Sequence, residues 1–255
     1  MKQIRSVAEL LEEKFDQYNR PSFIKADPIS VPHRYSVKED REIAGFLAAT
    51  IAWGQRKSIV QSALKLMILM DDAPYKFIMH FGESDLKRFA GFVHRTFNFT
   101  DITVFLYALK NIYQVHGGME KVFADGLKKD GMDQAIGHFR NVFFEVPHAA
   151  RTRKHVSNPL SGSCAKRINM YLRWMVRNDG RGVDFGIWKS IRPDQLICPL
   201  DVHSGRVARR LGLLNRKQDN WKAATELTEN LRLLDPDDPV KYDFALFGLG
   251  VFEKF

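Results

Sequence analysis

A turn of small residues that opens into a helix lies in the stretch Ser161-Gly162-Ser163-Cys164-Ala165-Lys166-Arg167-Ile168-Asn169. The apolar residues that follow recur at helical intervals, at Ile168, Tyr171, Leu172 and Met175, and they predict a helix over residues 163–177 with one buried stripe. A second face of this helix carries Lys166, Asn169, Arg173 and Arg177. Lys166 is therefore expected in the first turn of the helix, off the core.

The position of Lys166 suits an amine nucleophile. A lysine attacks carbon only as the neutral amine, and the positive end of a helix dipole disfavours its ammonium form. The preceding residues Ser161, Gly162 and Ser163 are expected to leave backbone N–H groups free, which suits a DNA phosphate. The alternative is a solvated lysine on a capped helix, and most single lysines are of that kind.

Asp201 lies in a second informative stretch, Pro199-Leu200-Asp201-Val202-His203-Ser204-Gly205-Arg206-Val207. The pattern predicts a helix over residues 202–211 that is N-capped by Asp201 and ends at Gly212. An ionised carboxylate at this position could stabilise the positive charge that develops on a sugar as its glycosidic bond breaks. His203 and Arg206 are candidates for contacts with DNA phosphates. The alternatives are a helix cap without catalysis for Asp201 and solvated surface for the other two.

Helical patterns run through most of the chain, so the predicted fold class is all-α. Residues 1–18 have an amphipathic helical pattern, a capping box at Ser36 precedes a helix that ends at Gly54, and further helices are predicted over residues 57–70, 100–117, 120–127 and 132–144. Residues 28–35, with two prolines, are expected to be an extended connector. Residues 178–199, rich in glycine and proline, are expected to be a long connector with one short helical turn.

The composition is that of a soluble globular protein, with 45% apolar and 27% charged residues among 255. The longest apolar stretch, residues 43–53, is about half the length of a membrane span, and the N-terminal pattern is not that of a signal peptide, so we expect a cytoplasmic protein with no membrane partner. A net charge of +9 and a pI near 9.5 favour a polyanionic partner. The two cysteines, Cys164 and Cys198, are too few for a four-thiolate metal or iron–sulfur site, and neither a metal nor another cofactor is expected.

Both motifs resemble those of the helix-hairpin-helix DNA glycosylase superfamily (HhH-GPD), which includes endonuclease III and the 8-oxoguanine glycosylases. Residues 162–169 align with the hairpin that carries the Schiff-base lysine of this superfamily, and Lys166 takes the place of that lysine. Residues 200–207 match the motif that contains the catalytic aspartate, here Asp201. The Asp-Val-His triplet at 201–203 is the form seen in eukaryotic 8-oxoguanine glycosylase, in which the histidine contacts phosphate.

Two features make this resemblance closest to the 8-oxoguanine branch. The interval between Lys166 and Asp201 is 201 − 166 = 35 residues, longer than in endonuclease III, and the C-terminal iron–sulfur cysteines of endonuclease III are absent. One departure from the hairpin motif is that Cys164 stands at its second glycine. The whole chain also resembles the uncharacterised bacterial family DUF2400, with residues 32–34 and 244–250 in its pattern.

The resemblance implies two helical subdomains with a cleft between them. A six-helix barrel with the helix-hairpin-helix is expected over residues 36–178, and a second helical domain over residues 1–35 and 179–255, with the catalytic aspartate at the junction. Gln55 ends a segment similar to one whose polar side chain fills the space left by a flipped base. Trp53 and Phe247 are candidates to stack on that base, and Asp243 to read one of its N–H groups. Packing in the core or at the surface is the alternative for each of these residues.

The function that the resemblance implies is base excision from damaged double-stranded DNA by a monomeric enzyme. Lys166 would attack the sugar of a flipped nucleotide carrying an oxidised base, with 8-oxoguanine as the expected lesion, and the Schiff base would permit AP-lyase cleavage. Two other functions remain open from the residues: a non-catalytic helix-hairpin-helix DNA-binding protein, and a helical enzyme acting on a nucleoside or a modified RNA base. The presence of both Lys166 and Asp201 favours the glycosylase, because a pure binding module needs neither.

Overall fold

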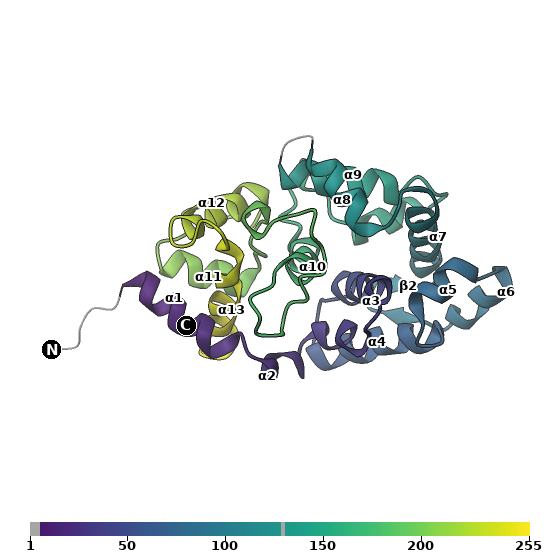
Figure 1. The fold of residues 1–255 in the computed structure, drawn as a ribbon, viewed down its shortest axis with the longest axis horizontal. Coiled ribbons are helices and arrows are strands. Elements are labelled where there is room, and N and C mark those ends of the chain that lie inside the picture. Colours follow the sequence, from purple (N-terminus) through teal and green to yellow (C-terminus); the bar gives the residue numbers. More distant parts are fainter. Residues whose placement is uncertain (1–5, 129–130) are drawn as a thin grey trace. The chain divides into compact units, whose positions relative to one another are not determined.

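The computed structural model describes residues 6–128 and 131–255, and the protein is all-α, as predicted (Figure 1). In this part of the chain the strands form one two-stranded antiparallel sheet, in which β1 (Val93–His94) pairs with β2 (Phe97–Asn98). None of the described helices combines the length and the apolar character that a membrane crossing requires.

The chain divides into two compact units. The internal unit contains residues 24–160, and the terminal unit combines the described residues up to Phe23 with residues 161–255. The sequence led us to expect domain boundaries after residues 35 and 178, whereas the structure divides the chain after residues 23 and 160. The stretch 161–178 therefore groups with the two ends of the chain, and residues 24–35 group with the internal segment.

The internal unit is built around α3 (Lys38–Thr50), in which every residue from Glu42 to Thr50 is buried. Phenylalanine rings fill much of its core: Phe46 stacks on Phe105 with 5.7 Å between ring centroids, and Phe105 meets Phe143 edge-on at 4.7 Å. The other helices of this unit are α4 (Arg56–Leu69), α5 (Pro74–His80), α6 (Glu83–Leu86), α7 (Phe99–Val115), α8 (Met119–Leu127) and α9 (Met132–Phe143). A short 3₁₀ turn, η3 (Lys87–Phe89), follows α6, and two others, η4 (Ala150–His155) and η5 (Pro159–Ser161), follow α9.

Two local predictions in the internal unit are wrong. The capping box expected at Ser36 does not form, because α3 begins at Lys38 and Val37 is its N-cap. Residues 28–35 are not extended but form the 3₁₀ turns η1 (Pro28–Ser30) and η2 (Pro32–Arg34). Proline is favourable at the first position of a helical turn, and the Asp27 side chain caps η1 by accepting the Ile29 N–H at 3.1 Å.

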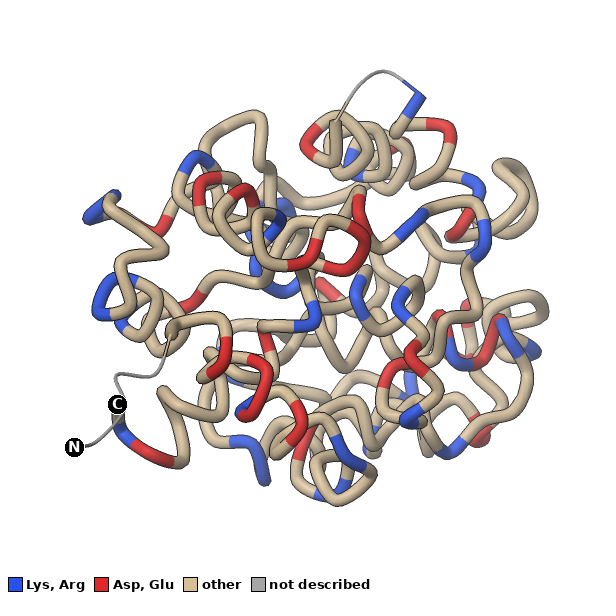
Figure 2. Tube along the Cα trace, turned by 60° about the vertical axis from the view of Figure 1, so that its left-hand side comes forward, with Lys and Arg blue, Asp and Glu red and all other residues tan. Residues whose placement is uncertain are grey.

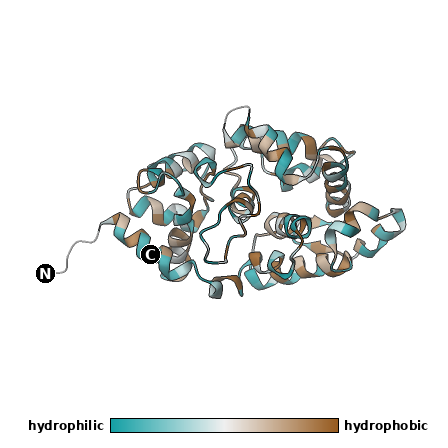
Figure 3. Ribbon diagram, viewed as in Figure 1, coloured by the Kyte–Doolittle hydropathy of each residue, from teal (hydrophilic) through white to brown (hydrophobic). Residues whose placement is uncertain are grey.

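The terminal unit places α13 (Asp243–Val251) against both α1 (Val7–Tyr18) and α11 (Val202–Arg210). A Cβ atom on Gly248 would lie 2.0 Å from the Tyr18 ring, and one on Gly250 would lie 3.0 Å from the His203 carbonyl oxygen, so glycine permits both close approaches. The remaining elements are α2 (Pro21–Ile24) at the passage to the internal unit, α10 (Lys166–Val176), η6 (Pro193–Gln195), α12 (Trp221–Arg232) and η7 (Pro239–Tyr242). Figure 3 shows hydrophobic and hydrophilic residues mixed along most helices, as expected of helices with one buried face.

Two buried arginines hold α10 in the terminal unit. Arg177, which is 1% exposed, donates from Nη2 to Asp179 at 2.9 Å, from Nη1 to Asp184 at 3.2 Å and from Nε to Asp238 at 2.8 Å. The guanidinium lies 5.2 Å from the ring centroid of Phe15 on α1. The three aspartates come from segments that follow α10, so this one side chain joins those segments to the helix.

Arg173 makes the corresponding contacts one turn earlier on α10. It is 3% exposed, donates from Nε to Asp184 at 3.3 Å and from Nη1 to Asp243, and lies 4.1 Å from the ring centroid of Phe244. Asp184 therefore bridges both arginines. The face of α10 that was expected to lie off the core is buried at Arg173 and Arg177, because the aspartates supply the partners that a buried guanidinium requires.

Arg177→Met removes the guanidinium but keeps most of the apolar volume of the side chain. Asp238 would then lose its arginine partner, and Asp179 and Asp184 would each lose one of their two, so we expect the free energy of unfolding to fall by about 3–5 kcal/mol. Urea unfolding followed by tryptophan fluorescence would measure this change, because Trp174, Trp188 and Trp221, three of the four tryptophans, lie in the terminal unit.

The control for this prediction is Arg192→Met, which breaks the more exposed ion pair with Asp194. Exposed pairs contribute little, so this variant is expected to leave the unfolding midpoint nearly unchanged. Equal effects of the two substitutions would contradict the role assigned to Arg177.

Candidate active site

A tight turn precedes α10 and sets the direction of its first residue, Lys166. Gly162 has φ +89°, and the N-cap Ala165 is left-handed with φ +47° and ψ 33°. The Gly162 carbonyl accepts the Trp221 N–H at 3.0 Å, and Ser163 forms an antiparallel bridge with Asn220. Residues 161–163 are exposed, so their predicted contact with a DNA phosphate is sterically open; it stays a prediction.

Two side chains fasten this turn to its surroundings. Asn169, which is 1% exposed, donates from Nδ2 to the Cys164 carbonyl at 3.0 Å. The Cys164 thiol donates to the Leu200 carbonyl at 3.5 Å, and burial raises the pKa of this thiol. The cysteine at the position of the motif's second glycine therefore links the turn to the residue just before Asp201.

Lys166 and Asp201 form an ion pair, with 2.7 Å between Nζ and Oδ2. The lysine side chain is 33% exposed and the aspartate side chain 16%. Asp201 is the N-cap of α11, as predicted, and its Oδ1 accepts the N–H groups of His203 at 2.8 Å and Ser204 at 2.9 Å. One carboxylate oxygen thus caps the helix and the other contacts the amine.

The surroundings of Asp201 keep it ionised. Burial raises the pKa of its carboxyl, but the charge of Lys166 and the hydrogen bonds from Lys166 and Ser204 outweigh burial, and the net pKa lies below its ordinary value. The site therefore holds a fixed negative charge 2.7 Å from a primary amine that is partly open to solvent.

Asp243 is a second carboxylate near this pair. It is the first residue of α13, is 7% exposed and accepts from Arg173. Burial raises its pKa to about 6 despite the charge of Arg173, and the nearby charge of Asp201 raises the pKa further. A raised pKa of Asp243 agrees with the excess of carboxylates around it, since the two arginines Arg173 and Arg177 pair with four aspartates, Asp179, Asp184, Asp238 and Asp243. The predicted contact of Asp243 with a flipped base is not tested by this arrangement.

The other predicted residues of the terminal unit lie on α11 and α13. His203 is exposed on the first turn of α11. Arg206 is exposed too, and its guanidinium donates to the carbonyls of Gly250 at 2.9 Å and Phe255 at 3.1 Å. Phe247 is half-buried, with its ring 6.0 Å from that of Phe23. The contacts of these residues with DNA or a base stay predictions.

Trp53 and Gln55 belong to the internal unit. The Trp53 ring stacks on His155, with 5.8 Å between ring centroids, and meets the edge of His94 at 5.4 Å. Gln55 is exposed and is the N-cap residue of α4. Its backbone carbonyl accepts the Ile59 N–H at 3.0 Å, the first hydrogen bond of that helix. Stacking of Trp53 on a base and insertion of Gln55 into DNA stay predictions.

Sequence reasoning missed the burial of Asn169 and Arg173, which lie on the same helix as Lys166 and bind the Cys164 carbonyl and two aspartates. The available signal was the spacing of Arg173 and Arg177, one turn apart on the helix that begins with Lys166, together with the four aspartates that follow. An arginine can be buried on a helix when carboxylates elsewhere in the chain pair with it.

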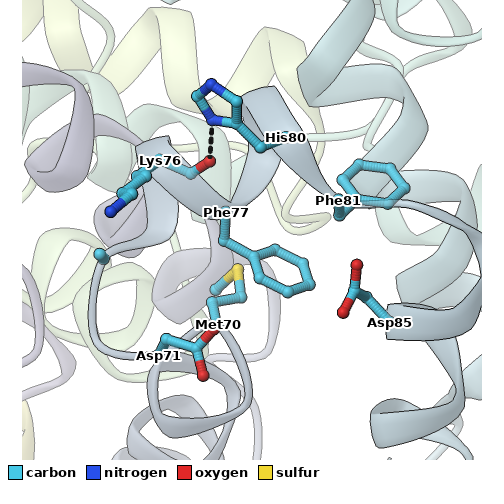
Figure 4. Close-up of a pocket in the computed structure, with 8 residues that line it drawn as sticks. Met70, Asp71, Lys76, Phe77, His80, Phe81 and Asp85 are labelled. Atoms are coloured by element: carbon cyan, nitrogen blue, oxygen red, sulfur yellow. Dashed lines mark hydrogen bonds between the residues drawn. The ribbon is translucent and has the colours of Figure 1, made fainter.

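A pocket of about 290 Å³ lies in the internal unit, apart from the predicted residues (Figure 4). Met70, Phe77 and Phe81 are among the residues that line it, and the His80 ring hydrogen-bonds to the Lys76 carbonyl at 2.8 Å. Asp71 at its rim is already bound by Arg88 at 2.7 Å. Among the described residues no group of three or more His, Cys, Asp or Glu side chains is placed to hold a metal ion.

A family model described as "Protein of unknown function (DUF2400)" matches residues 27–252. Neither the curated proteins nor the solved structures give a match.

The carboxyl of Asp238 allows a test of the buried charge network. Burial raises its pKa to about 6, above the value of 3.8 expected in the unfolded chain. The folded state therefore binds this proton more tightly, so the stabilisation is complete below about pH 4 and is lost as the pH rises through 6. Asp238→Asn, which stays neutral, is expected to lose less stability than the wild type between pH 5 and pH 8, by about 1.4 kcal/mol. Urea unfolding at both pH values measures this difference, and parallel pH profiles would contradict it.

Proposed function

The chain belongs to the DUF2400 family, and we propose that it is a DNA glycosylase that excises an oxidised base through a Schiff base on Lys166, with AP-lyase activity. The observation that carries the proposal is the contact of 2.7 Å between the Lys166 amine and the Asp201 carboxylate. A primary amine and a fixed carboxylate at this separation are the two groups that such chemistry needs.

The local structure supports separate roles for the two groups. Lys166 stands at the first position of α10 behind an exposed turn, where a substrate can reach its Nζ. Asp201 is held by two backbone N–H groups, so its charge is oriented before a substrate binds. Oriented charge of this kind stabilises a transition state without the cost of reorganisation.

The proposed reaction begins with a flipped nucleotide. Lys166 loses a proton to water, and its lone pair forms a bond to C1′ of the sugar while the bond from C1′ to the base breaks. The base leaves with the bonding electron pair and takes a proton from water. Asp201 stabilises the oxocarbenium-like charge on the sugar during this step. Opening of the sugar ring gives the imine, and β-elimination then breaks the C–O bond 3′ to the lesion.

Damaged double-stranded DNA is the proposed partner. The net charge of +9 favours a polyanion, and Figure 2 shows basic residues in both units, interspersed with acidic ones. In the terminal unit, the exposed turn at 161–163 and the exposed His203 and Arg206 could contact phosphates. An oxidised purine such as 8-oxoguanine is the proposed lesion, by the resemblance of the two motifs to the 8-oxoguanine glycosylases.

Borohydride trapping tests the nucleophile. The protein would be incubated with duplexes that carry 8-oxoguanine, an oxidised pyrimidine, uracil or an abasic site, and borohydride would reduce any imine to a stable covalent adduct. We expect an adduct with the oxidised-purine and abasic duplexes that is lost in Lys166→Gln and retained in Lys217→Gln, which changes an exposed lysine of the same unit. Tight duplex binding with no adduct on any lesion would refute the Schiff-base mechanism and leave a monofunctional glycosylase or a binding protein.

The variant Asp201→Asn tests whether Asp201 acts through its negative charge or only as the N-cap of α11. Asparagine is as good an N-cap as aspartate, so the variant should remain folded with a nearly unchanged thermal midpoint. The charge beside the amine is lost, and we expect the rate of adduct formation to fall by about 10²–10³-fold. Single-turnover trapping on the substrate identified above measures the rate. A rate within a few-fold of the wild type would show that Asp201 acts only as a helix cap.

A further inference from the structure

The turn between α3 and α4 carries the exposed Gln55 and is enclosed by side chains from other segments of the internal unit. The Trp53 N–H donates to the Ile51 carbonyl at 2.7 Å, which closes the end of α3. Gly54 follows with φ +105°, a backbone conformation that favours glycine. A Cβ atom on Gly54 would also lie 2.8 Å from Nη1 of Arg95, so the loop between β1 and β2 packs directly on this turn.

His94 fastens the backbone of this turn to the helix that follows. It is 5% exposed, with Nε2 at 3.3 Å from the Trp53 carbonyl oxygen and Nδ1 at 2.8 Å from Oγ of Ser62 on α4. Burial lowers the pKa of His94, so the ring is neutral near pH 7 and carries one N–H. Because a carbonyl can only accept, Nε2 donates to Trp53, and the Ser62 hydroxyl donates to Nδ1. One imidazole thus joins the turn that carries Gln55 to the body of α4.

His155 holds the largest side chain of the same turn. Its ring stacks on the Trp53 indole, with 5.8 Å between centroids and 21° between planes. The Nε2 atom of His155 lies 3.4 Å from the carboxylate of the fully buried Asp101. That carboxylate also accepts from Thr152 at 2.8 Å and from Arg151 at 2.9 Å, so its position is fixed. The backbone and the indole of the turn are therefore held by two different histidines.

We propose that His94 is a positioning residue for Gln55, which holds the turn in the conformation from which the Gln55 side chain enters the space left by a flipped base. The inference rests on the proposed function for its ligand, a nucleotide of duplex DNA whose base has left the stack. A loose turn would have to be ordered when DNA binds, and ordering costs free energy. A turn that buried hydrogen bonds already hold avoids that cost, which favours the flipped state of the DNA.

Two amide substitutions separate the two contacts of His94. In His94→Asn the shorter amide can reach the Ser62 hydroxyl in place of Nδ1 but not the Trp53 carbonyl. In His94→Gln the longer amide can donate to the Trp53 carbonyl in place of Nε2. The matched control is His116→Asn, which makes the same change at a histidine of the same unit whose Nε2 contacts Glu145 at 2.8 Å.

Base flipping can be followed by fluorescence with the full chain in excess. The duplex would carry 8-oxoguanine with 2-aminopurine as its neighbour, because 2-aminopurine becomes brighter when the stack beside it opens. We expect His94→Asn to lower the ratio of flipped to stacked DNA about fivefold, the effect of one hydrogen bond. His94→Gln and His116→Asn should stay within about twofold of the wild type.

A double-mutant cycle with Gln55→Ala separates positioning from a general loss of structure. If His94 acts through Gln55, adding His94→Asn to Gln55→Ala should change flipping by less than about twofold. A structural defect would instead lower flipping by the same factor in both backgrounds. Ser62→Ala, which leaves the imidazole in place but removes the hydroxyl that orients it, is a second variant and should lower flipping in the same direction as His94→Asn.

Three results would overturn the inference. They are wild-type flipping in both His94→Asn and Ser62→Ala, flipping in His94→Gln as low as in His94→Asn, and a full effect of His94→Asn in the Gln55→Ala background. Near-ultraviolet circular dichroism would check the folding of each variant, and Ser62→Ala decides the outcome if His94→Asn does not fold.

The inference and the proposed function can fail separately. Flipping that depends on His94, with no borohydride adduct on any duplex, would overturn the lysine mechanism alone. An adduct on the abasic duplex together with unchanged flipping in the His94 and Ser62 variants would overturn the role of His94 alone. A wild-type protein that gives neither a rise in fluorescence nor an adduct would overturn both.

Discussion

Two guanidinium groups buried on one helix constrain the rest of the terminal unit. Arg173 and Arg177 cannot be buried without carboxylates, and the four that serve them come from the segment after α10 and from the region where α13 begins. Meeting that requirement joins the start of α13 to α10 through the contact of Asp243 with Arg173. The packing of the unit thus depends on how it neutralises its buried charge.

The fold class could be predicted because it depends on local pattern, whereas Lys166 and Asp201 were brought together by the resemblance of their two motifs to one family. The helices predicted over residues 57–70 and 132–144 occur as Arg56–Leu69 and Met132–Phe143, since apolar spacing defines a helix nearly independently of its neighbours. The motif containing Asp201 likewise predicted a helix cap, which depends on a few adjacent residues.

The predictions that failed, and the contacts that were missed, depend on distant partners or on backbone geometry. The lysine helix begins at Lys166 rather than near residue 163, because the left-handed Ala165 ends the preceding turn. Arg173 and Arg177 were placed off the core because a single helix shows an arginine as polar, and the aspartates that permit its burial lie up to 70 residues away. Helical periodicity carries no information about such partners.

The contact between α1 and α13 bears on the order in which the chain acquires structure. Tyr18 packs against Gly248, and Tyr242 hydrogen-bonds to Glu12 across 230 residues of sequence. During synthesis the first helix therefore emerges long before its partner exists, while residues 24–160 have a core of their own and can close first. The terminal unit would be completed only at the last stage, when α13 leaves the ribosome and packs against a helix made at the outset.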